Sequence, residues 1–148
     1  MQRLGLLIGA FGALALPSVA AEDPVAQRQA IMSSVGAAAG VAGGVMKNEI
    51  PYAPALGKSV IATIHAAAMT YGGYFPEGSE DPARSKAAPA IWSDRAGFDA
   101  ELAKLLAATS AAAEKAGRDG PADAATFAAL IKPVMEECSS CHEKFRLK

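Results

Sequence analysis

Apolar residues recur every three or four positions along most of this chain of 148 residues, a spacing that predicts amphipathic α-helices. Four such stretches follow one another, at about residues 24–48, 55–71, 94–116 and 120–145. Alanine is abundant and runs of β-branched residues are few, so the composition favours helix over strand. The pattern therefore predicts an all-α fold, an antiparallel four-helix bundle.

Residues that cap or break helices mark the expected boundaries. Asp23 with Pro24 begins the first helix, because aspartate caps exposed amides and proline is tolerated at the first helical position. Gly120 with Pro121 is expected to begin the fourth helix. Pro133 lies inside that helix, where it removes one backbone hydrogen bond and should kink or restart the helix.

The second and third helices are joined by residues 72–93, where glycine, proline and mixed charges predict a long connection over one end of the bundle. Trp92, the single tryptophan, is expected to fold back and become buried. Ser93 or Asp94 then caps the third helix, and Gly117 ends it.

The first predicted helix contains four glycines, each of which weakens an isolated helix by up to ~1 kcal/mol relative to alanine: Gly36, Gly40, Gly43 and Gly44. Contacts with the rest of the fold must therefore hold this helix together. The glycines either allow a flat ring or a neighbouring helix to approach closely, or they mark fraying and the end of the helix near Gly43.

The first 21 residues have the pattern of a secretory signal peptide, with a positive start, an apolar centre at residues 4–16 and small residues at Ala20 and Ala21. A membrane anchor is the alternative, but the apolar run is shorter than the ~20 residues that a spanning helix needs. We predict a signal peptide over residues 1–21 and a single bundle domain over residues 22–148.

The mature chain is nearly neutral. Without Arg3 it has 13 basic and 15 acidic side chains, a formal net charge of −2. No basic patch is present in the sequence, so nucleic-acid binding is not expected.

The last eleven residues contain Cys138, Cys141 and His142 in the spacing Cys-x-x-Cys-His, which is the attachment sequence of a c-type haem. Residues three apart share a helix face, so both thiols can reach the two vinyl groups along one porphyrin edge. The adjacent His142 is then the expected proximal ligand of the iron. The motif predicts one haem c, bound covalently through two thioethers.

A redox-active dithiol and a zinc site are the alternatives to haem. A thioredoxin-like dithiol usually begins a helix, where the helix N-terminus lowers a thiol pKa, whereas this pair lies at the far end of one. A structural zinc needs four ligands, and the only other histidine, His65, lies one residue off the inner face of the second helix. We expect His65 to be a surface or boundary residue and not an iron ligand.

Export and haem attachment support each other, because covalent haem is attached outside the bacterial cytoplasm. We therefore predict a periplasmic protein, secreted across the bacterial inner membrane, with no membrane span after signal cleavage. Both cysteines would be used in thioethers.

Three segments resemble the cytochrome c′ family: residues 138–146 (CSSCHEKFR), 28–32 (RQAIM) and 89–94 (PAIWSD). As in that family, and unlike in small class I cytochromes c, the haem motif lies at the C-terminal end of the fourth helix. The resemblance covers nearly all of the mature chain and extends to the low-spin, methionine-ligated members. It implies a four-helix bundle, which in this family often forms a homodimer through the first two helices.

The same resemblance implies roles for two residues of the first helix. Arg28 corresponds to an arginine that approaches a haem propionate, and Met32 to the residue on the distal side of the iron. Residues four apart share a helix face, so the Arg28 guanidinium could contact the edge of the haem ring while the Met32 thioether lies over its centre. The alternatives are an ordinary solvated charge for Arg28 and core filling for Met32.

Two functions fit the sequence. In an electron carrier that cycles between Fe(III) and Fe(II), His142 and Met32 would both bind the iron, and the partners would be periplasmic redox proteins. In a gas-binding protein Met32 would lie beside a five-coordinate haem that binds nitric oxide or carbon monoxide. We favour the electron carrier, because residues 75–92 look more like the low-spin members. An enzyme such as a peroxidase is disfavoured, because the first helix offers Gln29 near Met32 but no histidine or carboxylate.

Overall fold

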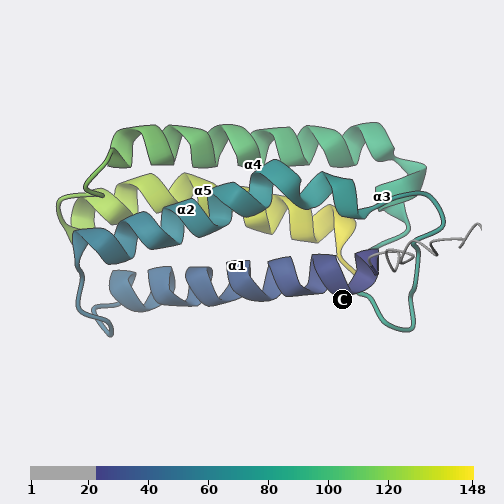
Figure 1. Cartoon of the computed structure of the whole chain (residues 1–148), viewed down its shortest axis with the longest axis horizontal. Coiled ribbons are helices and arrows are strands. Elements are labelled where there is room, and N and C mark those ends of the chain that lie inside the picture. Colours follow the sequence, from purple (N-terminus) through teal and green to yellow (C-terminus); the bar gives the residue numbers. More distant parts are fainter. Residues whose placement is uncertain (1–22) are drawn as a thin grey trace, which may run out of the picture.

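The computed structural model describes residues 23–148, which fold into four long helices lying side by side (Figure 1). They are α1 (Pro24–Met46), α2 (Pro54–Thr70), α4 (Arg95–Ala116) and α5 (Ala124–Phe145). The α1–α2 and α4–α5 turns lie at one end, and the α2–α4 connection lies at the other with the C-terminus (Figure 1). The predicted all-α, antiparallel four-helix bundle is confirmed. The predicted signal peptide lies outside the described residues.

The long connection between α2 and α4 is partly helical. It contains a 3₁₀ turn, η1 (Tyr71–Tyr74), and the short helix α3 (Ala90–Ser93). Its only strand-like pairing within the described part of the chain is a single antiparallel bridge between Ala87 and Arg146. Trp92 is half-buried in this connection, and its indole N–H donates a hydrogen bond to the Pro76 carbonyl at 3.0 Å.

Most of the predicted helix ends are found. The Asp23 carboxylate accepts hydrogen bonds from the amides of Val25 and Ala26, and so caps α1. The Asp94 carboxylate accepts a hydrogen bond from the Gly97 amide at 3.0 Å, and so caps α4. Gly117 ends α4 with φ of 60°, a left-handed conformation that glycine adopts without strain.

The start of α5 corrects the prediction. The helix begins three residues after Pro121, and its cap is Asp123, which accepts a hydrogen bond from the Thr126 amide at 2.7 Å. Gly120 has φ of 90°, which no helix can include, and the Tyr52 hydroxyl donates to the Pro121 carbonyl at 2.6 Å. Gly120 and Pro121 thus form the turn and not the first helical residues. Pro133 neither breaks nor restarts α5, which is continuous around it.

The glycines of α1 differ in what surrounds them. At Gly44 a Cβ atom would lie 2.5 Å from the Cδ1 atom of Ile50, so this glycine lets the chain turn back closely where the helix ends. At Gly40 and Gly43 a Cβ atom would meet no other atom within 4 Å. Gly36 borders the cavity described below. The helix ends at Met46, two residues earlier than predicted.

Two groups of buried side chains make the core. The larger joins all four long helices and is aliphatic apart from one ring: Ala38, Ala42, Val45, Val60, Ile61, Ile64, Ala112, Ala116, Phe127, Ile131 and Val134. The smaller is mostly aromatic and joins the long connection to α4 and α5: Phe75, Ile91, Phe98 and Phe145. The cavity lies beside the second group.

Candidate haem site

A cavity of about 590 Å³ lies between the helices and is lined in part by the long connection and the last turns of α5. Its volume is in the range of cofactor sites, which are about 300–1,000 Å³. The structure brings all five predicted site residues to its wall: Arg28 and Met32 from α1, and Cys138, Cys141 and His142 from α5. The rest of the wall is largely apolar, with Ile64, Phe75, Phe98, Leu102, Leu105 and Phe145 among its side chains.

The two cysteines are partly buried on one face of α5. Burial raises the pKa of the Cys138 thiol, and burial, with the nearby Glu101 carboxylate adding to it, raises the pKa of the Cys141 thiol to about 11. Both thiols are therefore protonated at neutral pH, whereas a redox-active dithiol depends on a lowered thiol pKa. Their burial near the C-terminal end of α5 therefore disfavours a thioredoxin-like function.

A zinc site is also disfavoured. Within residues 23–148 there is no group of three or more histidine, cysteine or acidic side chains placed to hold a metal ion. His65 lies between α2 and α4, with its Nδ1 atom 3.2 Å from the Thr109 hydroxyl, and it does not border the cavity. His142 borders the cavity with an exposed side chain, and its pKa is lowered by partial desolvation and by the charge of Arg146.

Arg28 is enclosed at the edge of the cavity, and only 2% of the residue is exposed. Its guanidinium donates hydrogen bonds to the Tyr74 carbonyl at 3.3 Å and to the Ser79 hydroxyl and carbonyl at 3.2 and 2.8 Å. It also lies over the rings of Phe75 and Trp92, 5.1 and 5.6 Å from their centres. Arg28 is thus not an ordinary solvated charge, and its burial lowers the pKa of the guanidinium.

One donor of Arg28 is left over. Its Nε atom is buried and has no hydrogen-bond partner among residues 23–148. A buried unpaired donor is costly, so such a group usually has a partner that the protein atoms do not supply. An anionic carboxylate, such as a haem propionate, fits a charged donor on the wall of an apolar cavity. The residues present therefore fit haem c.

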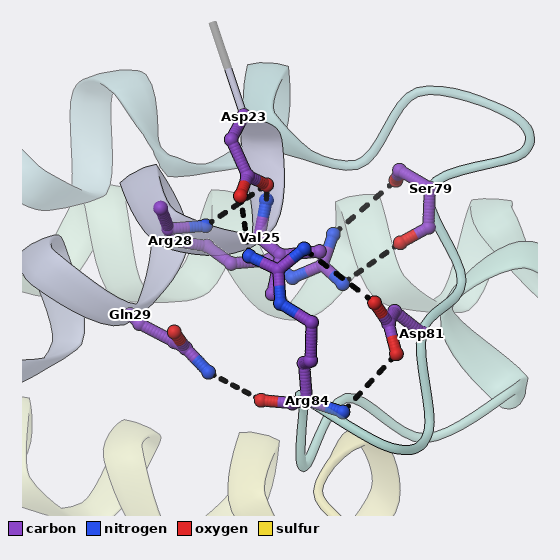
Figure 2. Close-up of polar contacts among 8 residues, drawn as sticks. Asp23, Val25, Arg28, Gln29, Ser79, Asp81 and Arg84 are labelled. Carbon is purple, nitrogen blue, oxygen red and sulfur yellow. Dashed lines mark hydrogen bonds and ion pairs between the residues drawn. The ribbon is translucent and has the colours of Figure 1, made fainter.

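The long connection ties α1 to the end of α5, and Figure 2 shows its contacts with α1. On one side Arg84 pairs with Asp23 and Asp81, and the Gln29 side chain donates a hydrogen bond to the Arg84 carbonyl. On the other side the Ala88 amide donates to the Phe145 carbonyl at 3.0 Å. The intervening residues 85–87 line the cavity, so this segment forms part of its rim.

Sequence reasoning did not assign a role to two further residues near the cysteines. Tyr71 lines the cavity, and burial raises its pKa to about 12, with the neighbouring Cys141 contributing. Glu101 is buried under α5. In the sequence, Glu101 lies between Phe98 and Leu105 at the helical spacing of an inner position. A carboxylate at such a position is the pattern that would have drawn attention to it.

Comparison with known proteins identifies the family of this chain. Residues 23–146 match the family model described as Cytochrome C′. The chain belongs to the cytochrome c′ family. The predicted resemblance is thereby confirmed, and with it the haem c cofactor, since members of this family bind one covalent haem c and the two cysteines are present.

The similar proteins include both cytochromes c-556 and cytochromes c′. A cytochrome c-556 of Agrobacterium fabrum is 36% identical over 138 residues, which are 93% of this chain and 90% of the relative. The structure of cytochrome c′ from Rhodopseudomonas palustris has 34% identity and a TM-score of 0.76, covering 86% of this chain and 98% of that one. A structure of oxidized cytochrome c556 from the same organism has 30% identity and a TM-score of 0.72, covering 86% and 98%.

Proposed function

We propose that this c-type cytochrome is a periplasmic electron carrier in which His142 and Met32 would both bind the haem iron. One observation carries the proposal: Met32 from α1 and His142 from α5 line the same apolar cavity. Arg28, one turn before Met32, supplies a buried donor at its edge. A thioether and an imidazole together make the His/Met ligand set found in electron-transfer haem proteins.

Each side chain has a distinct task in this proposal. Cys138 and Cys141 tether the ring to α5, and His142 follows directly in the chain, so the tether holds its imidazole close to the iron. The Met32 sulfur would bind the iron as the second protein ligand and so would exclude small ligands. Haem iron, when bound, supplies one-electron exchange between Fe(III) and Fe(II). Arg28 holds the acidic edge of the ring through a charge-assisted hydrogen bond.

Binding of nitric oxide or carbon monoxide is the second candidate, and the similar proteins favour neither over the other, since both c-556 and c′ are among them. The largely apolar wall of the cavity also suits an uncharged diatomic gas, which loses little hydration when it enters. In this alternative Met32 only forms part of the wall. The two functions therefore differ in whether the Met32 sulfur binds the iron.

Visible and EPR spectra of the purified oxidised and reduced protein test that bond. We expect a low-spin spectrum that Met32→Ala converts to a high-spin one, together with a lower reduction potential and binding of carbon monoxide. Met69→Ala is the control, because Met69 is 65% exposed on α2 and lies outside the cavity. A high-spin spectrum and ready carbon monoxide binding in the unmodified protein would establish the gas-binding function instead.

We assign no catalytic role. Among the described residues that line the cavity there is no carboxylate, and His142 is the one histidine. Proton transfer to a bound oxidant would need such a group on the Met32 side. This supports an electron carrier or a gas-binding protein over an enzyme.

The outer face of α1 supports the proposal of a homodimer through α1 and α2. This helix is apolar enough and long enough to cross a membrane, yet only 22% of its most apolar 18 residues are buried in the bundle. Its exposed positions are mostly small, among them Ser33, Ala37 and Gly40, so another helix could pack closely there. Light scattering of the mature protein tests the dimer, and a monomer at all concentrations would exclude it.

A further inference from the structure

Glu101 is a buried carboxylate that the proposed function does not use. It lies on α4 and faces α5, and the residue is 4% exposed. Its oxygens accept hydrogen bonds from Lys104 at 2.8 Å, Lys144 at 2.9 Å and Ser140 at 2.8 Å. A buried carboxylate that accepts hydrogen bonds from three side chains is held in one position, unlike a carboxylate in a single surface ion pair.

Two of these three donors belong to the haem-attachment segment of α5. Ser140 stands between the two cysteines, and Lys144 follows His142 by two positions. The Glu101 carboxylate therefore holds α5 on both sides of Cys141 and His142. No other carboxylate of the described chain accepts a side-chain hydrogen bond from residues 138–145.

The carboxylate is covered by side chains and does not lie deep in the core. The Lys104 and Lys144 side chains above it are 55% and 52% exposed, so their ammonium groups reach water. The hydrogen bonds from Lys104, Lys144 and Ser140 lower the pKa of Glu101 to about 2, so it is charged at neutral pH. Its charge is compensated within the cluster, and replacing it leaves two lysines without their partner.

We propose that Glu101 is a positioning residue that anchors the Cys-x-x-Cys-His turn of α5 to α4. The anchor keeps Cys138 and Cys141 facing the cavity and fixes the last turns of α5 to α4, in addition to the packing of the Phe145 ring and the backbone hydrogen bond from Ala88 to the Phe145 carbonyl. Its role toward the iron rests on the proposed haem site, since it acts there through His142. The anchoring itself is a property of the α4–α5 contact.

The test compares Glu101→Gln with Glu114→Gln, a matched change at an exposed position of the same helix. Hydrogen–deuterium exchange of residues 138–145 is measured on the protein as purified, with the haem content from intact mass. We expect about tenfold faster exchange in Glu101→Gln, the size expected from one lost charge-assisted hydrogen bond, and no change in Glu114→Gln. Ser140→Ala, which leaves both lysines paired, should give a smaller increase.

The reduction potential is a second measurement. A loosened helix by itself does not predict whether the potential rises or falls, whereas the loss of the Glu101 charge does. Glu101→Gln removes a negative charge and leaves two positive ones beside the attachment segment, which disfavours Fe(III), so we expect a higher potential. Equal exchange and equal potential in Glu101→Gln and Glu114→Gln would overturn the inference. A purified protein without covalent haem would overturn the proposed function, while the exchange comparison would still decide whether Glu101 anchors α5.

Discussion

At the end of the bundle that holds the α1–α2 and α4–α5 turns, aliphatic side chains from all four long helices meet and fill the core. At the other end the side chains surround a cavity of about 590 Å³. The first end is closed by Phe127 and Ile131, neither of which is exposed to solvent. The second is framed by aromatic rings that meet edge to face, such as Phe75 against Phe98 with centres 4.9 Å apart.

The two ends also differ in their polar contacts. At the filled end, helix turns are short and closed by backbone conformation, as at Gly117 and Gly120. At the cavity end, charged side chains fix the structure: Arg28 binds the long connection, and Glu101 binds α5. A protein interior is normally packed as densely as an organic crystal, and the haem c that this family binds would complete the core at the cavity end. The following predictions test that difference between the ends.

The largest effect is expected from replacing both cysteines. Cys138→Ser with Cys141→Ser should abolish covalent haem attachment, so that the intact mass lacks one haem. The cavity end should then be loosely packed, because the group that completes its core is no longer held. Hydrogen exchange should rise around the cavity more than at residues 127–134. Ser139→Ala, an exposed neighbour, should keep the haem, and native-like cooperative unfolding of the haem-free chain would contradict the prediction.

Phe127→Ala should destabilise the filled end of the bundle and leave the cavity unchanged. Phe127 is completely buried and does not line the cavity, so its truncation should cost about 3–5 kcal/mol of unfolding free energy. Urea unfolding measures the loss, and the visible spectrum of the folded protein should be unchanged. A changed spectrum would mean that the two ends are not separate.

Arg28→Lys should affect the cavity end by a smaller amount. Lysine keeps the charge but not the planar fork that reaches the Tyr74 and Ser79 carbonyls, so we expect a loss of roughly 1–3 kcal/mol in unfolding free energy. The reduction potential should also change if this residue holds a propionate. Arg118→Lys, at the opposite end of the bundle, is the matched control and should change neither measurement.

Acid should remove the contribution that the Glu101 carboxylate makes to stability. Its pKa is lowered from 4.5 to about 2 in the folded protein, so its ionised form stabilises the fold above pH 4.5, and this contribution is lost as the pH falls toward 2. The difference in unfolding free energy between the unmodified protein and Glu101→Gln should thus shrink over that interval. A difference that stays constant from pH 6 to pH 2 would show that the carboxylate charge has no part in it.

Several features of the site followed from the chain alone. The Cys-x-x-Cys-His spacing is a local pattern whose chemistry depends on residues within one helical turn, so Cys138, Cys141 and His142 could be predicted without any tertiary contact. The four helices followed from the periodicity of apolar residues, and Asp23 and Asp94 marked two of their starts. Arg28 and Met32 required the family resemblance, because one turn of helix does not reveal what lies opposite.

Other features depended on contacts between segments far apart in the sequence. Asp123 caps α5 and Pro121 lies in the preceding turn, where the Tyr52 hydroxyl, 69 residues away, binds the Pro121 carbonyl. The burial of Arg28 depends on Ser79, and the pairing of Glu101 depends on Ser140 and Lys144, 39 and 43 residues away. The sequence by itself determined which residues can attach the haem, since that chemistry is local. Only the tertiary structure decided which charges are buried around it, because burial and pairing exist only once distant segments pack together.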